Sequence, residues 1–167
     1  MNTSRPTRSK YTPEVGAAKQ QLYREAHKRL SRAIKNGFHI EAIAITESIM
    51  SDRIESAISS ITGQVVEIDS LGRLISMFHL EHPIDDGFRI ELREWNRARG
   101  QVIHQMVKLT NEHQATWRER MTFARHTAIQ GEVLLKELRK VTDKVIRGGH
   151  KQKSATSTPA TPKALKD

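Results

Sequence analysis

The sequence predicts an all-α helical bundle of about five helices, and three observations support this fold class. Apolar residues recur at steps of three and four along most of the chain, which is the period of an amphipathic helix. No segment alternates apolar and polar residues between hairpin turns, so no strand is predicted. Aromatic residues make up only 5% of the 167 residues, a composition that suits helices packed through aliphatic side chains. We expect one helical domain over residues 12–147, with disordered basic ends at residues 1–11 and 148–167.

The first helix is predicted to begin at Thr12-Pro13-Glu14. This tripeptide combines a hydroxyl that can cap the helix, a proline whose missing N–H costs nothing in the first turn, and an acid that faces the positive end of the helix dipole. Asn36-Gly37 supplies a stop signal. The opposite face of this helix is rich in Lys and Arg. The apolar stripe consists of Val15, Ala18, Leu22, Ala26, Leu30 and Ala33.

The most apolar helix is predicted from about Phe38 to Ile61, and we expect it to lie at the centre of the bundle. Glu47 falls about 40° from the middle of its apolar stripe, at ~100° per residue. A carboxylate in that position must be paired, neutralised or placed at a cleft, unless it lies at the rim and reaches water. Thr62-Gly63-Gln64 is predicted to end the helix. The stripe is Ile43, Met50, Ile54, Ala57 and Ile61, widened by Ala42, Ile45 and Ile49.

A shorter third helix is predicted after a cap at Asp69 or Ser70, and it is expected to end before Pro83. Residues three apart share a helix face, so His79 and His82 have the spacing of two metal ligands. No third strong ligand follows at a recognisable spacing, and no metal site is therefore predicted. The apolar stripe is Leu71, Leu74, Ile75 and Phe78.

Two longer helices complete the predicted bundle. The fourth is capped by Asp85-Asp86-Gly87 and has Arg99 on its apolar stripe, which consists of Phe88, Leu92, Trp95, Arg99, Val102, Met106 and Leu109. The last helix is expected to end near Arg147, and its Gly131 would allow a neighbouring helix to approach closely. Its stripe is Trp117, Met121, Ala124, Ala128, Gly131, Leu135, Leu138 and Val145.

Composition excludes several classes of site. The chain has no cysteine, which excludes disulfides, thiolate zinc sites and cysteine nucleophiles. No apolar run approaches the ~20 residues that span a bilayer and no signal-peptide region is recognised, so we expect a cytoplasmic protein without a membrane partner. Neither a Gly-rich phosphate loop nor a Ser elbow is present, which disfavours nucleotide hydrolysis and acyl transfer. The formal charge of +9 lies mostly in the two ends, at Arg5, Arg8, Lys10, Lys151, Lys153, Lys163 and Lys166.

The strongest candidate for a functional site is the stretch from Glu94 to His104 on the fourth predicted helix. On a helical wheel Arg97 and His104 lie within about 20° of each other, whereas Arg99 and His104 lie about 140° apart. The face shared by Arg97 and His104 also carries Arg93, Gln101 and Lys108. This basic face suits an anionic ligand or the acidic surface of a partner.

Arg99 points toward the core on the same wheel and needs a counter-charge, for which Glu47 is the candidate. Asn96, in the same stretch, is included with Glu47 as a supporting residue. Gly100 marks one of two features. Either the helix kinks there, which would bring Arg99 and His104 to one cleft, or another helix, for example from a second subunit, packs closely against it.

The segment Arg99-Gly100-Gln101-Val102-Ile103-His104 resembles the Arg-x4–6-His signature of HEPN domains, which often have two apolar residues before the histidine. The all-helical organisation of residues 13–147 is similar to that family as well. Gly100 stands where the family commonly has Asn or another polar residue, and Arg97 also satisfies the spacing to His104.

The resemblance implies a homodimer whose two Arg/His pairs meet in an interfacial cleft, and a metal-independent endoribonuclease that needs no cofactor. His104 would be the catalytic acid or base, and Arg99 or Arg97 would hold the phosphate of an RNA substrate. Members of the family often act as toxins or in phage defence, and a neutralising protein partner would fit such a role.

A noncatalytic function is the alternative prediction. The chain would then be a helical dimerisation or scaffold module, or a nucleic-acid-binding bundle. Few aromatic side chains are expected at the surface for base stacking, because Trp95 and Trp117 both lie on predicted apolar stripes. The other histidines are scattered and form no predicted triad or ligand set.

Overall fold

The computed structural model describes residues 13–66, 70–107 and 116–155, and these residues form five helices and no strand. The predicted all-α class and the number of helices are therefore confirmed. The helices are α1 (Pro13–Lys35), α2 (His39–Thr62), α3 (Leu71–Glu81), α4 (Asp86–Val107) and α5 (Trp117–Ala155). None of the helices in the described part of the chain is long and apolar enough to cross a membrane.

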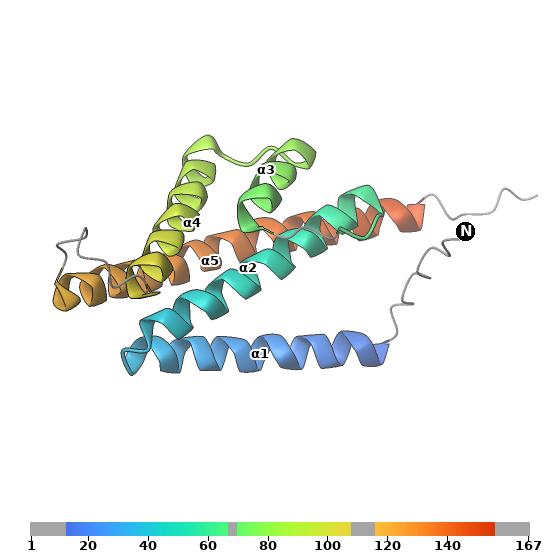
Figure 1. Cartoon of the computed structure of the whole chain (residues 1–167). Coiled ribbons are helices and arrows are strands. Elements are labelled where there is room, and N and C mark those ends of the chain that lie inside the picture. Colours follow the sequence, from blue (N-terminus) through green and yellow to red (C-terminus); the bar gives the residue numbers. More distant parts are fainter. Residues whose placement is uncertain (1–12, 67–69, 108–115, 156–167) are drawn as a thin grey trace, which may run out of the picture.

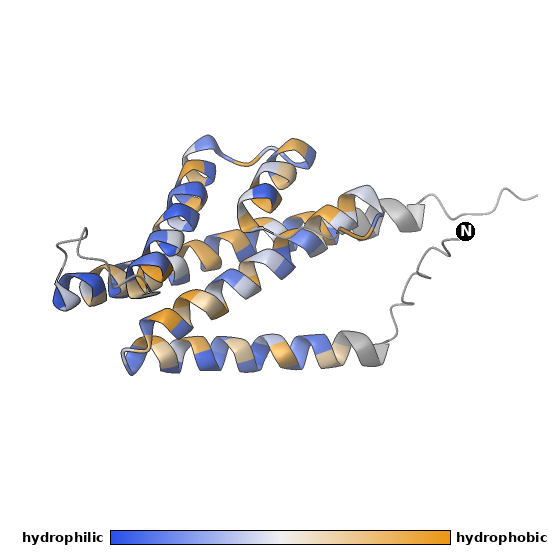
Figure 2. Cartoon of the chain, in the orientation of Figure 1, coloured by the Kyte–Doolittle hydropathy of each residue, from blue (hydrophilic) through white to orange (hydrophobic). Residues whose placement is uncertain are grey.

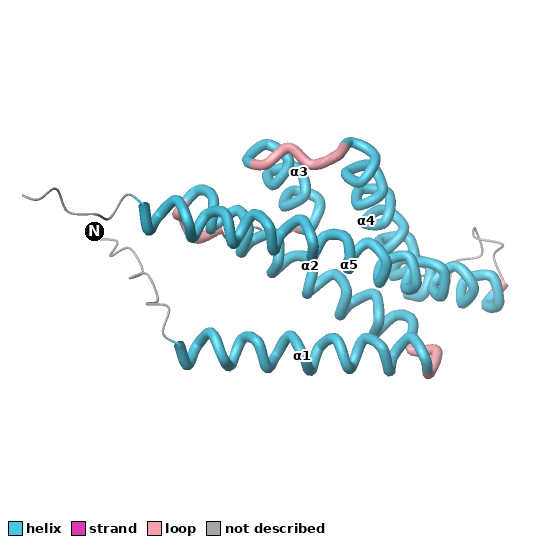
Figure 3. The backbone as a smooth tube through the Cα atoms, turned by 180° about the vertical axis from the view of Figure 1, so that it is seen from behind, coloured by secondary structure: helices cyan, strands magenta, loops and turns pink. Residues whose placement is uncertain are grey.

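Helices α2 and α5 lie side by side through the middle of the molecule and form its most extensive helix interface (Figures 1 and 3). α1 packs on α2 from one side, whereas α3 packs on α2 and α4 packs on α5 from the other. α1 alternates hydrophilic and hydrophobic bands along its length (Figure 2). The predicted central position of the second helix is confirmed, because its Ile43, Met50 and Ile54 are fully buried.

The ends of the helices follow the predicted signals, with one exception. Gly37 and Gly63 have φ angles of 81° and 72°, a left-handed conformation that glycine adopts without a steric penalty. Ser70 caps α3 by accepting a hydrogen bond from the Arg73 N–H. The predicted end near Arg147 is wrong, because α5 continues to Ala155. Each of the two glycines that follow Arg147 costs only about 1 kcal/mol in a helix, and residues 151–155 are mostly good helix formers, namely Lys, Gln and Ala.

Some predictions fall outside the described residues. These are the disordered arm at residues 1–11, the end of the predicted tail from residue 156, and the side chains of Lys108 and Leu109.

The two tryptophans have opposite environments. Trp95 is fully buried, and its indole Nε1 donates a hydrogen bond of 2.8 Å to the Thr127 carbonyl oxygen. A Cβ atom at Gly131 would lie 2.7 Å from that Nε1, so the predicted close approach at Gly131 is confirmed. Trp117 is 59% exposed, and its predicted place in the core is wrong. It is the first residue of α5, where the apolar stripe extends beyond the helices that cover it.

His27 of α1 is half-buried between α1, α2 and α5. Its Nε2 is buried and has no hydrogen-bond partner among the described residues. Burial lowers the pKa of His27, and the positive charges of Arg53 on α2 and Arg139 on α5 lower it further, against a smaller opposing effect of Glu132. The folded protein therefore binds a proton on His27 less readily than the unfolded chain does.

This pKa shift predicts a loss of stability in mild acid. Between the unfolded pKa of about 6.5 and the lower folded pKa, the unfolded chain binds more protons, so the free energy of unfolding falls as the pH decreases through that interval. Urea denaturation of the wild type and of H27Q from pH 7.5 downward measures the effect. The difference between the two proteins isolates His27, because burial also lowers the pKa of His39 in both. An identical pH dependence for the two would contradict the prediction.

Candidate functional site

The outer face of α4 carries the predicted basic surface. Arg97 and His104 are both exposed, and Arg93 and Gln101 lie on the same side of the helix. Trp95, on the opposite side, is fully buried. Among the described residues neither Arg97 nor His104 has a hydrogen bond or ion pair, whereas Arg93 donates a 3.0 Å hydrogen bond to the Ser76 hydroxyl of α3. The predicted separation of the two faces of this helix is confirmed.

Arg99 makes the predicted ion pair with Glu47. Its Nη2 lies 2.5 Å from Glu47 Oε1 of α2, and it donates a 3.1 Å hydrogen bond to Asn96 Oδ1 one turn earlier on α4. The two charged side chains are only 22% and 28% exposed, so the pair is partly shielded from water. A Cβ at Gly72 of α3 would lie 3.2 Å from Asn96 Nδ2. Glu47, Asn96 and Arg99 therefore form one network that joins α4 to α2 beside α3.

The structure does not bring Arg99 and His104 together within the chain. α4 is one continuous helix through Gly100, in which Arg99 is directed to Glu47 of α2 whereas His104 is exposed to solvent. A Cβ at Gly100 would have no neighbouring atom of the described residues within 4 Å. No helix of the described chain packs against Gly100, and the space beside it is open to a second molecule.

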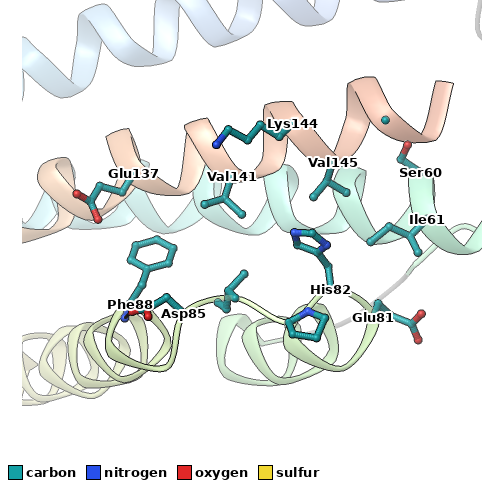
Figure 4. A pocket seen from close by; sticks show the side chains of 13 residues that line it. Ser60, Ile61, Glu81, His82, Asp85, Phe88, Glu137, Val141, Lys144 and Val145 are labelled. Carbon is teal, nitrogen blue, oxygen red and sulfur yellow. Dashed lines mark hydrogen bonds between the residues drawn. The ribbon is translucent and has the colours of Figure 1, made fainter. Parts of the chain in front are cut away.

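A groove with a volume of about 810 Å³ lies between α5 and the turn that joins α3 to α4. Figure 4 shows His82 of that turn and Phe88 of the first turn of α4 reaching toward Val141 and Val145 of α5. Its charged lining residues are Glu81, Asp85, Glu137 and Lys144, and its apolar ones are Ile61, Ile84, Phe88, Val141 and Val145.

This groove has the size of a small-molecule site but lacks a catalytic arrangement in the described residues. No hydrogen bond links His82 to a carboxylate of the described residues, and the Asp85 carboxylate accepts a hydrogen bond from the Phe88 N–H at the start of α4. Within the part of the chain that the structure describes, no group of three or more His, Cys, Asp or Glu residues could hold a metal ion. The groove also lies at the first turn of α4, whereas Arg97 and His104 lie in its second half.

Sequence reasoning missed this groove, although it considered His82 as a metal ligand. The sequence does show that Glu137, Val141 and Lys144 share one side of α5. It does not show that the turn between α3 and α4 packs opposite that side and closes the groove.

Comparisons of the chain with protein-family models, with characterised proteins and with solved structures gave no significant match. The function of the chain is therefore inferred from its residues and their geometry.

Proposed function

We propose that the chain is a HEPN-like, metal-independent endoribonuclease of the toxin or phage-defence type, acting on RNA as a homodimer in the cytoplasm. One observation carries the proposal: Arg97 and His104 lie exposed on the same face of α4, and neither is engaged by another described residue. A guanidinium and an imidazole in this relation can act on one phosphodiester.

The proposed chemistry uses the nucleophile within the RNA itself. The 2′-hydroxyl attacks the adjacent phosphorus while His104 takes its proton, and Arg97 stabilises the negative charge on the phosphorane oxygens. The P–O5′ bond then breaks as the protonated imidazole of His104 in one of the two subunits returns a proton to O5′, which leaves a 2′,3′-cyclic phosphate and a free 5′-hydroxyl. Arg97 is the better supported phosphate clamp, because the charge of Arg99 is already compensated by Glu47.

A second copy of the chain would complete the site. Ile90 and Ile103 of α4 are 50% and 37% exposed, and the space beside Gly100 is open among the described residues. Exposed apolar side chains on one helix suit packing between subunits. A neutralising protein partner would act by covering the same basic face.

The test is cleavage of single-stranded RNA by the purified protein in EDTA. We expect products with 2′,3′-cyclic phosphate ends and no cleavage of DNA of the same sequence. H104A should reduce the rate by about 100-fold or more, and R97A should reduce it more than R99M does. H126A is the matched control, because His126 is exposed on α5. An inactive parent protein, or equal cleavage by H104A, would refute the nuclease.

The noncatalytic alternative is favoured by the same exposed Ile90 and Ile103, which a dimerisation module would bury. It predicts a dimer in light scattering that leaves RNA intact. A monomeric protein would exclude both this alternative and the composite nuclease site.

A further inference from the structure

A row of four cations follows the outer face of α1. Arg24, Lys28, Arg32 and Lys35 are all exposed, and they lie on the side opposite Leu30, which is buried against the rest of the bundle. None of the four side chains has an ion pair or hydrogen bond among the described residues. The row extends about 16 Å along the helix, at ~1.5 Å per residue.

The row is distinct from the other cations of α1, which are bound within the fold. Lys19 pairs with Asp52 of α2 at 3.1 Å, and Arg29 pairs with Glu41 of α2 at 2.6 Å. These pairs hold α1 on α2 and compensate the acids along the interface between the two helices. The side chains of the four-residue row have no such partner among the described residues, so they can contact an anionic ligand from solvent.

Beside this row lies a groove of about 630 Å³ at the turn between α1 and α2, called here the elbow groove. Lys28 and Arg32 of the row line it, together with Phe38 from the start of α2. Phe38 is 59% exposed, and Leu22, also in the lining, is 67% exposed. Leu22 belongs to the apolar stripe of the first predicted helix, but its expected burial is wrong, because it lines this groove and is exposed to solvent.

The acids of the elbow groove do not cancel its basic character. Glu41 is paired with Arg29. Glu25 keeps its negative charge, because its hydrogen-bond donor, the Gln21 amide, is neutral. The four cations of the row exceed this one carboxylate, so the surface remains basic and presents an aromatic ring and small apolar side chains beside the row. A polyanion that also offers flat apolar rings fits this surface.

We propose that the elbow groove and the row on α1 bind single-stranded nucleic acid. Successive phosphates would lie along Arg24, Lys28, Arg32 and Lys35, and one base would stack on Phe38. In a duplex the bases stay stacked on each other, so its phosphates can contact the row but its bases cannot stack on the Phe38 ring. The identity of the strand as RNA rests on the proposed function, whereas the binding itself does not, because nothing in the groove requires a 2′-hydroxyl.

The test is fluorescence anisotropy with labelled 12-nucleotide single strands of uridine and of deoxythymidine, and with an RNA duplex. H104A serves as the background for RNA, so that cleavage cannot remove the probe. We expect R24Q/K28Q/R32Q/K35Q to weaken binding of both single strands at least 10-fold. The slope of log Kd against log salt should fall by about 0.7 for each phosphate that the variant no longer neutralises. F38A should weaken single-strand binding about 5- to 100-fold and leave duplex binding unchanged.

The matched control is R118Q/R125Q/K140Q/R147Q, which removes four exposed charges from α5 and should change binding much less. Equal losses of affinity in the two quadruple variants would show attraction by net charge alone and overturn the proposal, as would unchanged binding by F38A. A change in oligomeric state of the α1 variant without a change in binding would assign the row to a second copy instead. Binding of deoxythymidine by a protein that fails to cleave RNA would support the groove while refuting the nuclease.

Discussion

Replacing Trp95 by alanine is expected to lower the free energy of unfolding by about 3–5 kcal/mol. The indole is fully buried between α4 and α5, and Gly131 leaves room for it where any Cβ would collide. Truncation creates a cavity between two packed helices and removes the hydrogen bond to the Thr127 carbonyl. Denaturation in urea, followed by circular dichroism, measures the loss of stability.

W117A is the matched control, since it removes the same side chain from an exposed position. It should change the free energy of unfolding by no more than about 0.5 kcal/mol. Similar losses in the two variants would contradict the assignment of Trp95 to the core and Trp117 to the surface.

Breaking the ion pair between Glu47 and Arg99 is the second large expected effect. E47Q leaves a partly buried guanidinium without its counter-charge, and R99M leaves the carboxylate in the same situation. Each single change is expected to cost about 2–3 kcal/mol, and the double variant less than the sum, with a coupling of about 1–2 kcal/mol. Urea denaturation of the four proteins supplies this double-mutant cycle.

The pair of Lys136 and Glu132 on α5, at 3.0 Å and with side chains 68% and 34% exposed, is the control cycle. A surface pair one turn apart on a helix should couple by only about 0.3–0.5 kcal/mol. Additive losses at Glu47 and Arg99 would mean that the ion pair between them contributes no net stability. The proposed division of roles, with Arg99 structural and Arg97 free for a ligand, would then lose its main support.

Local signals were sufficient to predict most of the secondary structure. The cap at Ser70 and the stops at Gly37 and Gly63 depend on interactions within a few residues, and the structure has them where expected. The helical wheel also separated Arg99 from Arg97, because the direction of a side chain around a regular helix follows from its position alone.

The pairing of Arg99 with Glu47 was predictable for a related reason. Both residues interrupt apolar stripes, and charges on buried faces require partners. The end of α5 was not predictable in the same way, since the adjacent Gly148 and Gly149 weaken a helix without forbidding it.

The sequence by itself determined the helices of this protein and the side of each helix that carries charge, because both follow from periodicity within one segment. Only the tertiary structure decided which apolar side chains are covered. Trp95 and Trp117 lie on equivalent stripes, yet one is buried by α5 and the other extends beyond its neighbours. The elbow groove likewise requires two helices to meet at a particular angle, and that angle is set by packing between segments far apart in the chain.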